Sequence, residues 1–304
     1  MAAVEVKNII KTYDKGSVKA VNDVSFEVHD GELFGLIGPD GAGKTSLFRM
    51  LTTLLLADSG TATVEGFDVI KDYREIRNIV GYMPGKFSLY QDLTVEENLT
   101  FFATIFETTI EENYALIKDI YEQIKPFSNR RAGKLSGGMK QKLALCCALI
   151  HKPKILFLDE PTTGVDVVSR KEFWDMLNHL KKQGITIVVS TPYMDEATLC
   201  DRIALMQNGS IMSIDTPENI VKSFPKTLFA AKADNIYRLL QDLRTDQEVE
   251  SCFAFGEYLH FTMKDEASEV ENLEKRLTEK GHQNLEIKEV KPTIEDCFIR
   301  LMEK

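Results

Sequence analysis

The residues from Gly38 to Ser46 are the first stretch whose types and spacing could bind a phosphate ester. They read GPDGAGKTS and fit the pattern G-x-x-x-x-G-K-[ST]. Glycines let backbone N–H groups approach a polyphosphate, and a helix that follows directs its positive end at the same anion. The lysine ammonium would reach the β and γ phosphates, and the next hydroxyl suits Mg²⁺. A chance glycine turn is the competing interpretation. The candidate binding residues are Gly38, Pro39, Asp40, Gly41, Ala42, Gly43, Lys44, Thr45 and Ser46, and Thr45 is also a candidate metal ligand.

A second pair of reactive side chains ends the apolar run ILFLDEP at residues 155–161. A strand this apolar is typical of the interior of a parallel sheet, and groups at its end project into the crevice where ligands bind. Phosphoryl transfer needs an acid to hold Mg²⁺ and a base to take a proton from water. Asp159 and Glu160 fit these two roles in that order. A solvated strand end is the weaker alternative.

Two further features could contact a nucleotide. Ser136, Gly137 and Gly138 stand in LSGGMKQK, directly before an expected helix that runs to about Ile150. A helix start with a serine hydroxyl can bind an anion, but the same residues could be only an N-cap and a flexible turn. Tyr13 could stack on an adenine ring, although a lone tyrosine is more often half-buried packing.

The elements that must position these residues follow from apolar periodicity. Leu33 to Ile37 reads as a strand that ends at the glycine loop. Thr94 and Glu97 predict a helix that begins with a capping box, and Asn208-Gly209 predicts a hairpin. Further strands are expected at residues 4–9, 20–28, 61–64 and 185–190, further helices at residues 110–124 and 168–183 and from Pro217, and a buried helix face at Leu99, Phe102 and Phe106.

The pattern changes after Ser223-Phe224-Pro225. Short alternating strands around residues 259–263 and 285–287 are separated by helices such as that expected at residues 266–280. This predicts a small α+β domain with no cluster of catalytic residue types. We therefore expect two domains, at residues 1–223 and 224–304.

Composition limits the class of protein. The chain has 304 residues, 43% hydrophobic and 28% charged, which is typical of a soluble globular protein. No apolar run approaches the ~20 residues that span a bilayer, and the N-terminus lacks secretory features. We expect the chain to stay in the cytoplasm unless a partner holds it at a membrane. Its five cysteines suggest reduced thiols, and the net charge of −10 argues against a surface that coats nucleic acid.

Taken together, the motifs resemble the ATP-binding cassette (ABC) ATPase family over roughly residues 4–223. GPDGAGKTS resembles its Walker A loop, LSGGMKQK its signature sequence, ILFLDE its Walker B strand, and GVD at residues 164–166 its D-loop. Tyr13 falls where the family has its adenine-stacking aromatic residue. The resemblance implies an α/β P-loop NTPase cassette with a mixed-sheet core, an antiparallel β subdomain and an α-helical subdomain, here followed by the small α+β domain.

The resemblance also implies function. Such cassettes bind ATP and Mg²⁺ in a head-to-tail dimer, in which Ser136, Gly137 and Gly138 serve the nucleotide held by the partner. The sequence around GYMP, TTGVD and YMDEA resembles that of bacterial export cassettes of the drug or multidrug efflux type. Their separate membrane-spanning permease subunit holds the cassette on the cytoplasmic face of the cell membrane. A soluble clamp acting on ribosomes or DNA is the alternative, which the single cassette, the acidic balance and the absence of heptads disfavour.

Two departures from the family pattern affect the expected chemistry. The family usually has glutamine where this chain has Gly85, and histidine where it has Pro192. Neither replacement can contact Mg²⁺, the attacking water or the γ-phosphate through its side chain. Gln91 does not align with the family's glutamine and is not expected to replace it. We therefore expect this site to bind MgATP but hydrolyse it slowly, because donors to the transition state matter most. This favours an asymmetric heterodimer with a second cassette, while a homodimer that relies on Glu160 remains the rival.

Overall fold

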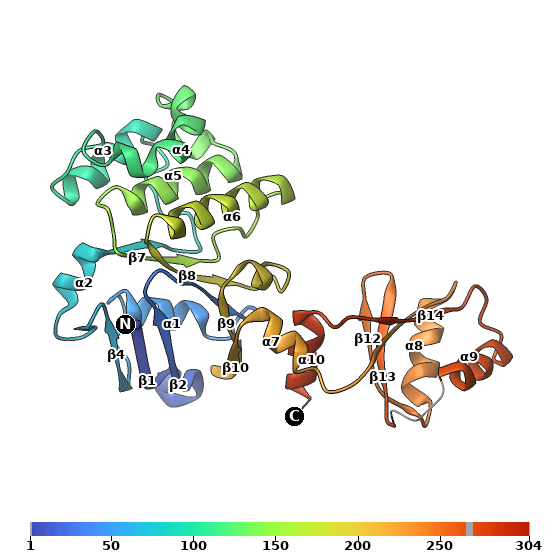
Figure 1. Cartoon of the computed structure of the whole chain (residues 1–304). Coiled ribbons are helices and arrows are strands. Elements are labelled where there is room, and N and C mark those ends of the chain that lie inside the picture. Colours follow the sequence, from blue (N-terminus) through green and yellow to red (C-terminus); the bar gives the residue numbers. More distant parts are fainter. Residues whose placement is uncertain (1, 266–269, 304) are drawn as a thin grey trace. The chain divides into compact units, whose positions relative to one another are not determined.

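The computed structural model describes residues 2–265 and 270–303, which form two compact units, Met1–Pro217 and Glu218–Lys304 (Figure 1). Helix α7 (Pro217–Lys222) begins where the two units divide. The domain boundary expected after Ser223 stays a prediction. Within the described residues, no helix is both long and apolar enough to cross a bilayer.

The N-terminal part of the first unit contains an antiparallel sheet. Its strand order is β2-β1-β4-β5, with β1 at Ala2–Tyr13, β2 at Val18–His29, β4 at Ser59–Val64 and β5 at Phe67–Asp68. The first two strands are longer than their apolar patterns predicted. The pairing of β1 with β2 shifts register between Val6 and Ile9, where Asn8 has a φ of 50°. Such a bulge resets the alternation of inward and outward side chains. The alternating apolar pattern that predicts the strand therefore stops before the strand itself ends.

A six-stranded mixed sheet forms the centre of the first unit. Its order is β10-β9-β3-β8-β7-β6, with β3 at Leu33–Ile37, β6 at Val80–Met83, β7 at Ile155–Asp159, β8 at Thr186–Thr191, β9 at Arg202–Gln207 and β10 at Ser210–Asp215. All neighbours pair in parallel except β9 and β10, which the predicted hairpin at Asn208-Gly209 joins. Because β3, β8 and β7 are adjacent and parallel, the loops that follow them meet at one edge of the sheet.

Helices lie on both sides of this sheet, which confirms the predicted α/β class. They are α1 (Lys44–Leu51), α2 (Tyr73–Ile79), α3 (Val95–Ile105), α4 (Tyr114–Ile124), α5 (Gly137–Leu149) and α6 (Val167–Lys182). Figure 1 shows α3, α4 and α5 gathered on one side of β7 and β8, with α1 on the other side. The predicted capping box of Thr94 and Glu97 is present at the start of α3.

The second unit contains an antiparallel sheet of order β12-β13-β11-β14, with helices α8 and α9 inserted as in a split β-α-β fold. Its elements are β11 (Leu228–Lys232), α8 (Ile236–Thr245), β12 (Val249–Phe255), β13 (Tyr258–Met263), α9 (Val270–Glu279), β14 (Glu286–Val290) and α10 (Ile294–Met302). Leucines of α8 and α9 pack against Leu259, Phe261 and Met263. The expected start of α9 at residues 266–269 lies outside the described residues.

Candidate functional site

The glycine loop leaves β3 and enters α1 through two positions where only glycine fits. A Cβ on Gly38 would lie 2.1 Å from the carbonyl oxygen of Met206, and one on Gly43 would lie 2.1 Å from that of Ala20. Gly43 also has a φ of 108°, which is left-handed backbone that favours glycine. The loop is therefore pressed against its neighbours, and its shape is fixed before any ligand binds.

The Lys44 ammonium lies in the centre of this loop. The residue is only 3% exposed, and Nζ donates to the carbonyl oxygens of Gly38 at 2.7 Å and Pro39 at 3.0 Å. Its third neighbour is Glu160 Oε1, at 3.3 Å. A buried ammonium needs such partners, and phosphate oxygens are among the strongest. The geometry can therefore bind an anion that takes the place of the Glu160 carboxylate.

Thr45 and Asp159 form the second contact across the site. Thr45 Oγ1 donates to Asp159 Oδ1 at 3.2 Å, and Asp159 is 2% exposed at the end of β7. A hydroxyl and a carboxylate are hard oxygen ligands that fit Mg²⁺, which usually takes one or two carboxylates together with phosphates and water. The described residues contain no group of three His, Cys, Asp or Glu side chains able to hold a metal without phosphates. The residues present thus fit a magnesium ion that arrives with a nucleotide.

Glu160 has an unusual backbone. Its φ is 50°, a left-handed conformation that costs a residue with a Cβ roughly 1–2 kcal/mol. The Glu160 N–H donates to the backbone oxygen of Ser190 at 3.0 Å and to its Oγ at 3.1 Å. Strained backbone of this kind concentrates at functional sites. It directs the Glu160 side chain toward Lys44 and the glycine loop.

Tyr13 lies beside the same loop. Its hydroxyl is 3.2 Å from Ser46 Oγ, and 38% of the residue is exposed. The strand end that carries it is held by Asp58, which accepts from the Thr12 N–H at 2.6 Å and from Lys11 Nζ at 2.7 Å. The Lys11 ammonium and the Thr12 groups lower the pKa of Asp58 to about 2. Sequence reasoning missed this anchor, because the turn at Asp58 gives no sign of the strand that it contacts.

The start of α5 is not part of this arrangement. Ser136 caps the helix by accepting from the Met139 N–H at 3.4 Å, and a Cβ on Gly138 would lie 2.9 Å from Ser169 Oγ. Among the described residues, no hydrogen bond or ion pair joins this helix start to residues 38–46. The structure therefore separates the two anion-binding features that the sequence predicts.

Both departures from the family pattern border the site. A Cβ on Gly85 would lie 3.0 Å from the Asp159 backbone oxygen, and Pro192 directly follows the end of β8. Gln91 lies elsewhere: its backbone oxygen accepts from the Gly133 N–H at 2.9 Å, before the start of α5. Gly85 thus adjoins Asp159, the candidate magnesium ligand, and Pro192 adjoins the end of β8. Neither residue has a side chain that could reach a nucleotide.

A buried carboxylate that sequence reasoning missed links the loops behind the site. Glu196 is 2% exposed and accepts from Thr162 Oγ1 at 2.8 Å and from Thr191 Oγ1 at 2.5 Å. Arg170 of α6 pairs with it at 3.0 Å. These contacts tie together the segments that follow β7 and β8. Thr162 and Glu196 lie in the segments TTGVD and YMDEA, but the sequence gives no signal that these segments contact each other.

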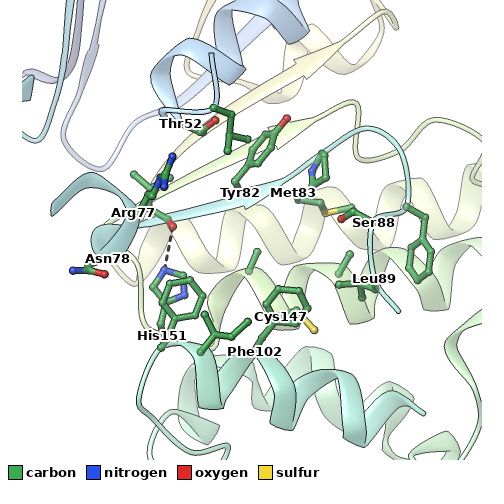
Figure 2. Close-up of a pocket in the computed structure, with 18 of the residues that line it drawn as sticks. Thr52, Arg77, Asn78, Tyr82, Met83, Ser88, Leu89, Phe102, Cys147 and His151 are labelled. Atoms are coloured by element: carbon green, nitrogen blue, oxygen red, sulfur yellow. Dashed lines mark hydrogen bonds between the residues drawn. The ribbon is translucent and has the colours of Figure 1, made fainter. Parts of the chain in front are cut away.

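An apolar groove of about 500 Å³ lies between the end of β6 and helices α3 and α5 (Figure 2). Figure 2 shows Thr52 and Tyr82 on one side and Phe102, Cys147 and His151 on the other. Phe102 and Phe106, expected in a core face with Leu99, are only partly buried. That prediction was wrong for both rings, since helical spacing cannot tell a core from a groove.

Two residues that line the groove each carry a buried polar atom without a hydrogen-bond partner among the described residues. The Tyr82 hydroxyl and His151 Nδ1 are buried and find no hydrogen-bond partner in the part of the chain that the structure describes. Burial, together with the nearby Asp159 carboxylate, raises the pKa of Tyr82 to about 12; the Arg49 side chain opposes this rise without reaching hydrogen-bonding geometry. Burial also lowers the pKa of His151, whose Nε2 lies 3.1 Å from the Val80 oxygen.

Comparison with known proteins agrees with the geometry. The family model described as ABC transporter matches residues 21–163. The probable multidrug ABC transporter ATP-binding protein YbhF of Escherichia coli is 38% identical over 99% of this chain, which spans only 52% of that protein. The chain thus covers about half the length of this relative. The Nod factor export ATP-binding protein I of Burkholderia lata is 35% identical, covering 99% of this chain and 97% of its own length.

Solved structures give the same result. A dimeric structure of the ATP-binding cassette MJ0796, in a post-hydrolysis state with ADP and Pi, superposes with a TM-score of 0.63 at 26% identity. The match covers 70% of this chain and 98% of that cassette.

Proposed function

The chain belongs to the ABC transporter family of ATP-binding proteins, and from this premise we propose that it is the ATP-binding subunit of an export system. Binding of MgATP would drive a separate membrane-spanning subunit. The observation that carries this proposal is the buried Lys44 ammonium, held beside Glu160 while Thr45 contacts Asp159. The names of the relatives, which include multidrug and Nod factor export proteins, support export.

The residues of the site divide the work between binding and chemistry. Lys44 and the backbone N–H groups of its loop would hold the β and γ phosphates, and Tyr13 would stack on adenine. Thr45 and Asp159 would hold Mg²⁺, which neutralises charge on the phosphate oxygens when bound. Glu160, released from Lys44, would accept a proton from the attacking water.

A second cassette would complete the site. Ser136, Gly137 and Gly138 lie apart from Lys44, so we propose that they contact the nucleotide held by a partner cassette. Gly85 and Pro192 leave this chain's own site without two side-chain donors, which would slow hydrolysis. We therefore favour a heterodimer with a more active cassette, and keep the homodimer as the rival.

The groove in Figure 2 is the proposed contact for the membrane subunit. Its aromatic and aliphatic lining borders Pro84 and Phe87, on either side of the Gly85 position that adjoins Asp159. An amphipathic helix of a permease fits such a groove through its apolar face. This contact would place the chain on the cytoplasmic face of the cell membrane.

Substitution of Lys44 by alanine tests nucleotide binding. Loss of a charge-assisted contact of about 1.5–3 kcal/mol should weaken affinity for a fluorescent ATP analogue roughly 10- to 100-fold. Lys226→Ala is the matched control, because Lys226 is partly buried and, like Lys44, paired with a carboxylate, that of Glu250 in the second unit. Unchanged affinity in Lys44→Ala would overturn the proposal.

The asymmetry and the partner need a reconstituted complex. In a complex with a permease and a second cassette, Glu160→Gln should leave most ATP turnover intact. A fall to background would contradict the asymmetric arrangement, and turnover by the purified chain at ~1 s⁻¹ or faster would favour the homodimer. Recovery of the chain from ribosome pellets instead of detergent-solubilised membranes would favour a soluble clamp.

A further inference from the structure

Ser190 is a buried polar residue with no role in the proposed mechanism so far. It lies in β8, where its Cα pairs in register with that of Asp159 in the neighbouring strand β7. The residue is fully buried, and its hydroxyl lies 2.6 Å from Asp159 Oδ1 and 3.1 Å from the Glu160 nitrogen. One hydroxyl thus contacts both acidic residues of the site.

The chemistry of the partners decides the direction of each hydrogen bond. An ionised carboxylate can only accept, so the Ser190 hydroxyl donates its proton to Asp159. A backbone N–H can only donate, so the same oxygen accepts from Glu160. Thr45 Oγ1 donates to the same Asp159 oxygen, at a longer 3.2 Å. The result is a directed chain from the Glu160 backbone through Ser190 to the Asp159 carboxylate.

This arrangement does more than satisfy a buried hydroxyl. The Glu160 N–H has a second acceptor, the Ser190 backbone oxygen at 3.0 Å, and does not depend on the hydroxyl. Among the described residues, the Asp159 carboxylate has two donors, Thr45 Oγ1 at 3.2 Å and Ser190 Oγ at the shorter 2.6 Å. Thr45 is itself a candidate metal ligand, whereas the hydroxyl of the fully buried Ser190 donates to the carboxylate alone and so serves to hold it in place.

We propose that Ser190 is the positioning residue of the magnesium site, holding the Asp159 carboxylate in the orientation that accepts the metal ion with its nucleotide. The inference rests on the proposed binding of MgATP. Partners that orient a metal ligand typically contribute about 10- to 100-fold to metal affinity. Ser190 is fully buried and acts through Asp159, to which its hydroxyl donates.

The test measures how much Mg²⁺ strengthens nucleotide binding. Affinity for a fluorescent ATP analogue is titrated with Mg²⁺ and with EDTA, and the ratio of the two dissociation constants is compared between variants. Ser190→Ala should lower the gain from Mg²⁺ about tenfold or more, while affinity in EDTA stays within about twofold of wild type, since the contacts to Lys44 remain. Hydrolysis does not enter this readout.

Thr186→Val is the matched control. Thr186 is a buried hydroxyl residue of the same strand, and it accepts from the Gly31 N–H at 2.9 Å at the opposite end of β8. Its loss should lower thermal stability but leave the gain from Mg²⁺ unchanged. Ser190→Thr restores a hydroxyl and should recover most of the gain, while Ser190→Cys, a weak donor of similar size, should not. These two variants decide the matter if Ser190→Ala does not fold.

Two failures can be told apart. An equal gain from Mg²⁺ in wild type, Ser190→Ala and Ser190→Cys would overturn the role of Ser190 alone. A wild-type chain whose nucleotide affinity ignores Mg²⁺ and survives Lys44→Ala would overturn the proposed function and this inference together.

Discussion

The candidate nucleotide site and the apolar groove adjoin the same sheet, yet their buried polar atoms differ in hydrogen bonding. In the site, the buried groups of Lys44, Asp159 and Ser190 all have hydrogen-bond partners within the chain. In the groove, the Tyr82 hydroxyl and His151 Nδ1 have none among the residues that the structure describes. A site whose groups are already held can bind a charged ligand with little reorganisation. The groove instead offers an apolar lining, which gains when another surface removes it from water.

The largest expected effect comes from a substitution that disrupts only the candidate nucleotide site. Asp159→Asn keeps the shape of the side chain but removes its charge, so the gain in ATP affinity from Mg²⁺ should fall by about 100-fold, the upper end for disturbed metal sites. Titration of a fluorescent ATP analogue with Mg²⁺ and with EDTA measures it. Without nucleotide, the amount of the variant that co-purifies with a permease should match that of wild type. A parallel loss of permease binding would show that the two regions do not act separately.

The next largest effect is expected from a substitution that disrupts only the groove. Phe102→Ala removes an aromatic side chain from the groove lining and should weaken permease binding about 30-fold, as for a central interface residue worth about 2 kcal/mol. ATP affinity should stay within about twofold. Phe101→Ala is the control, because Phe101 is the preceding residue of α3 but does not line the groove. Equal losses in both variants, measured by co-purification, would argue against the groove as the contact.

A smaller effect is expected when a paired and an unpaired buried hydroxyl are removed in turn. Tyr82→Phe removes a buried hydroxyl that has no partner, so the free energy of unfolding should rise by about 1 kcal/mol, whereas Ser190→Ala should lower it by about 1–3 kcal/mol. Urea unfolding followed by circular dichroism measures both. A loss of stability in Tyr82→Phe would mean that its hydroxyl is satisfied in solution, and the contrast between the two regions would weaken.

The smallest effect concerns pH. Burial lowers the pKa of His151 below that of the unfolded chain, near 6.5, so the unfolded state binds this proton first as the pH falls. The contribution of His151 to stability is therefore present above about pH 6.5 and is lost as the pH falls through its folded pKa. His151→Gln, which can still donate to the Val80 oxygen, should lose less stability between pH 7.5 and 5.5 than wild type. Urea unfolding at both values checks this, and equal losses would contradict it.

Local patterns predicted a large part of the fold. The run from Leu33 to Ile37, the capping box at Thr94 and the hairpin at Asn208-Gly209 were each confirmed, because their physics acts within a few residues. The predicted α/β class was also confirmed. Strand lengths were less accurate where a bulge such as that at Asn8 interrupts the alternation. The positions of Phe102 and Phe106 were wrong, because periodicity identifies an apolar face without showing what covers it.

The candidate site shows the same division. The glycine loop, Asp159 and Glu160 could be chosen from sequence, since their residue types and spacing are those that phosphate and magnesium require. The Asp58 anchor, the Glu196 contacts and the hydroxyl of Ser190 could not. Each of these includes a contact between segments more than 30 residues apart in the chain, and no local pattern predicts which segments will meet.

By itself the amino-acid order determined which backbone could cradle a phosphate and which carboxylates could serve it, because those demands are met by neighbours in the chain. Only the tertiary structure decided that Lys44 meets Glu160, that Ser190 holds Asp159, and that the signature helix start lies apart from the loop. These relations depend on which strands lie side by side in the sheet, and strand order is set by packing across the whole domain.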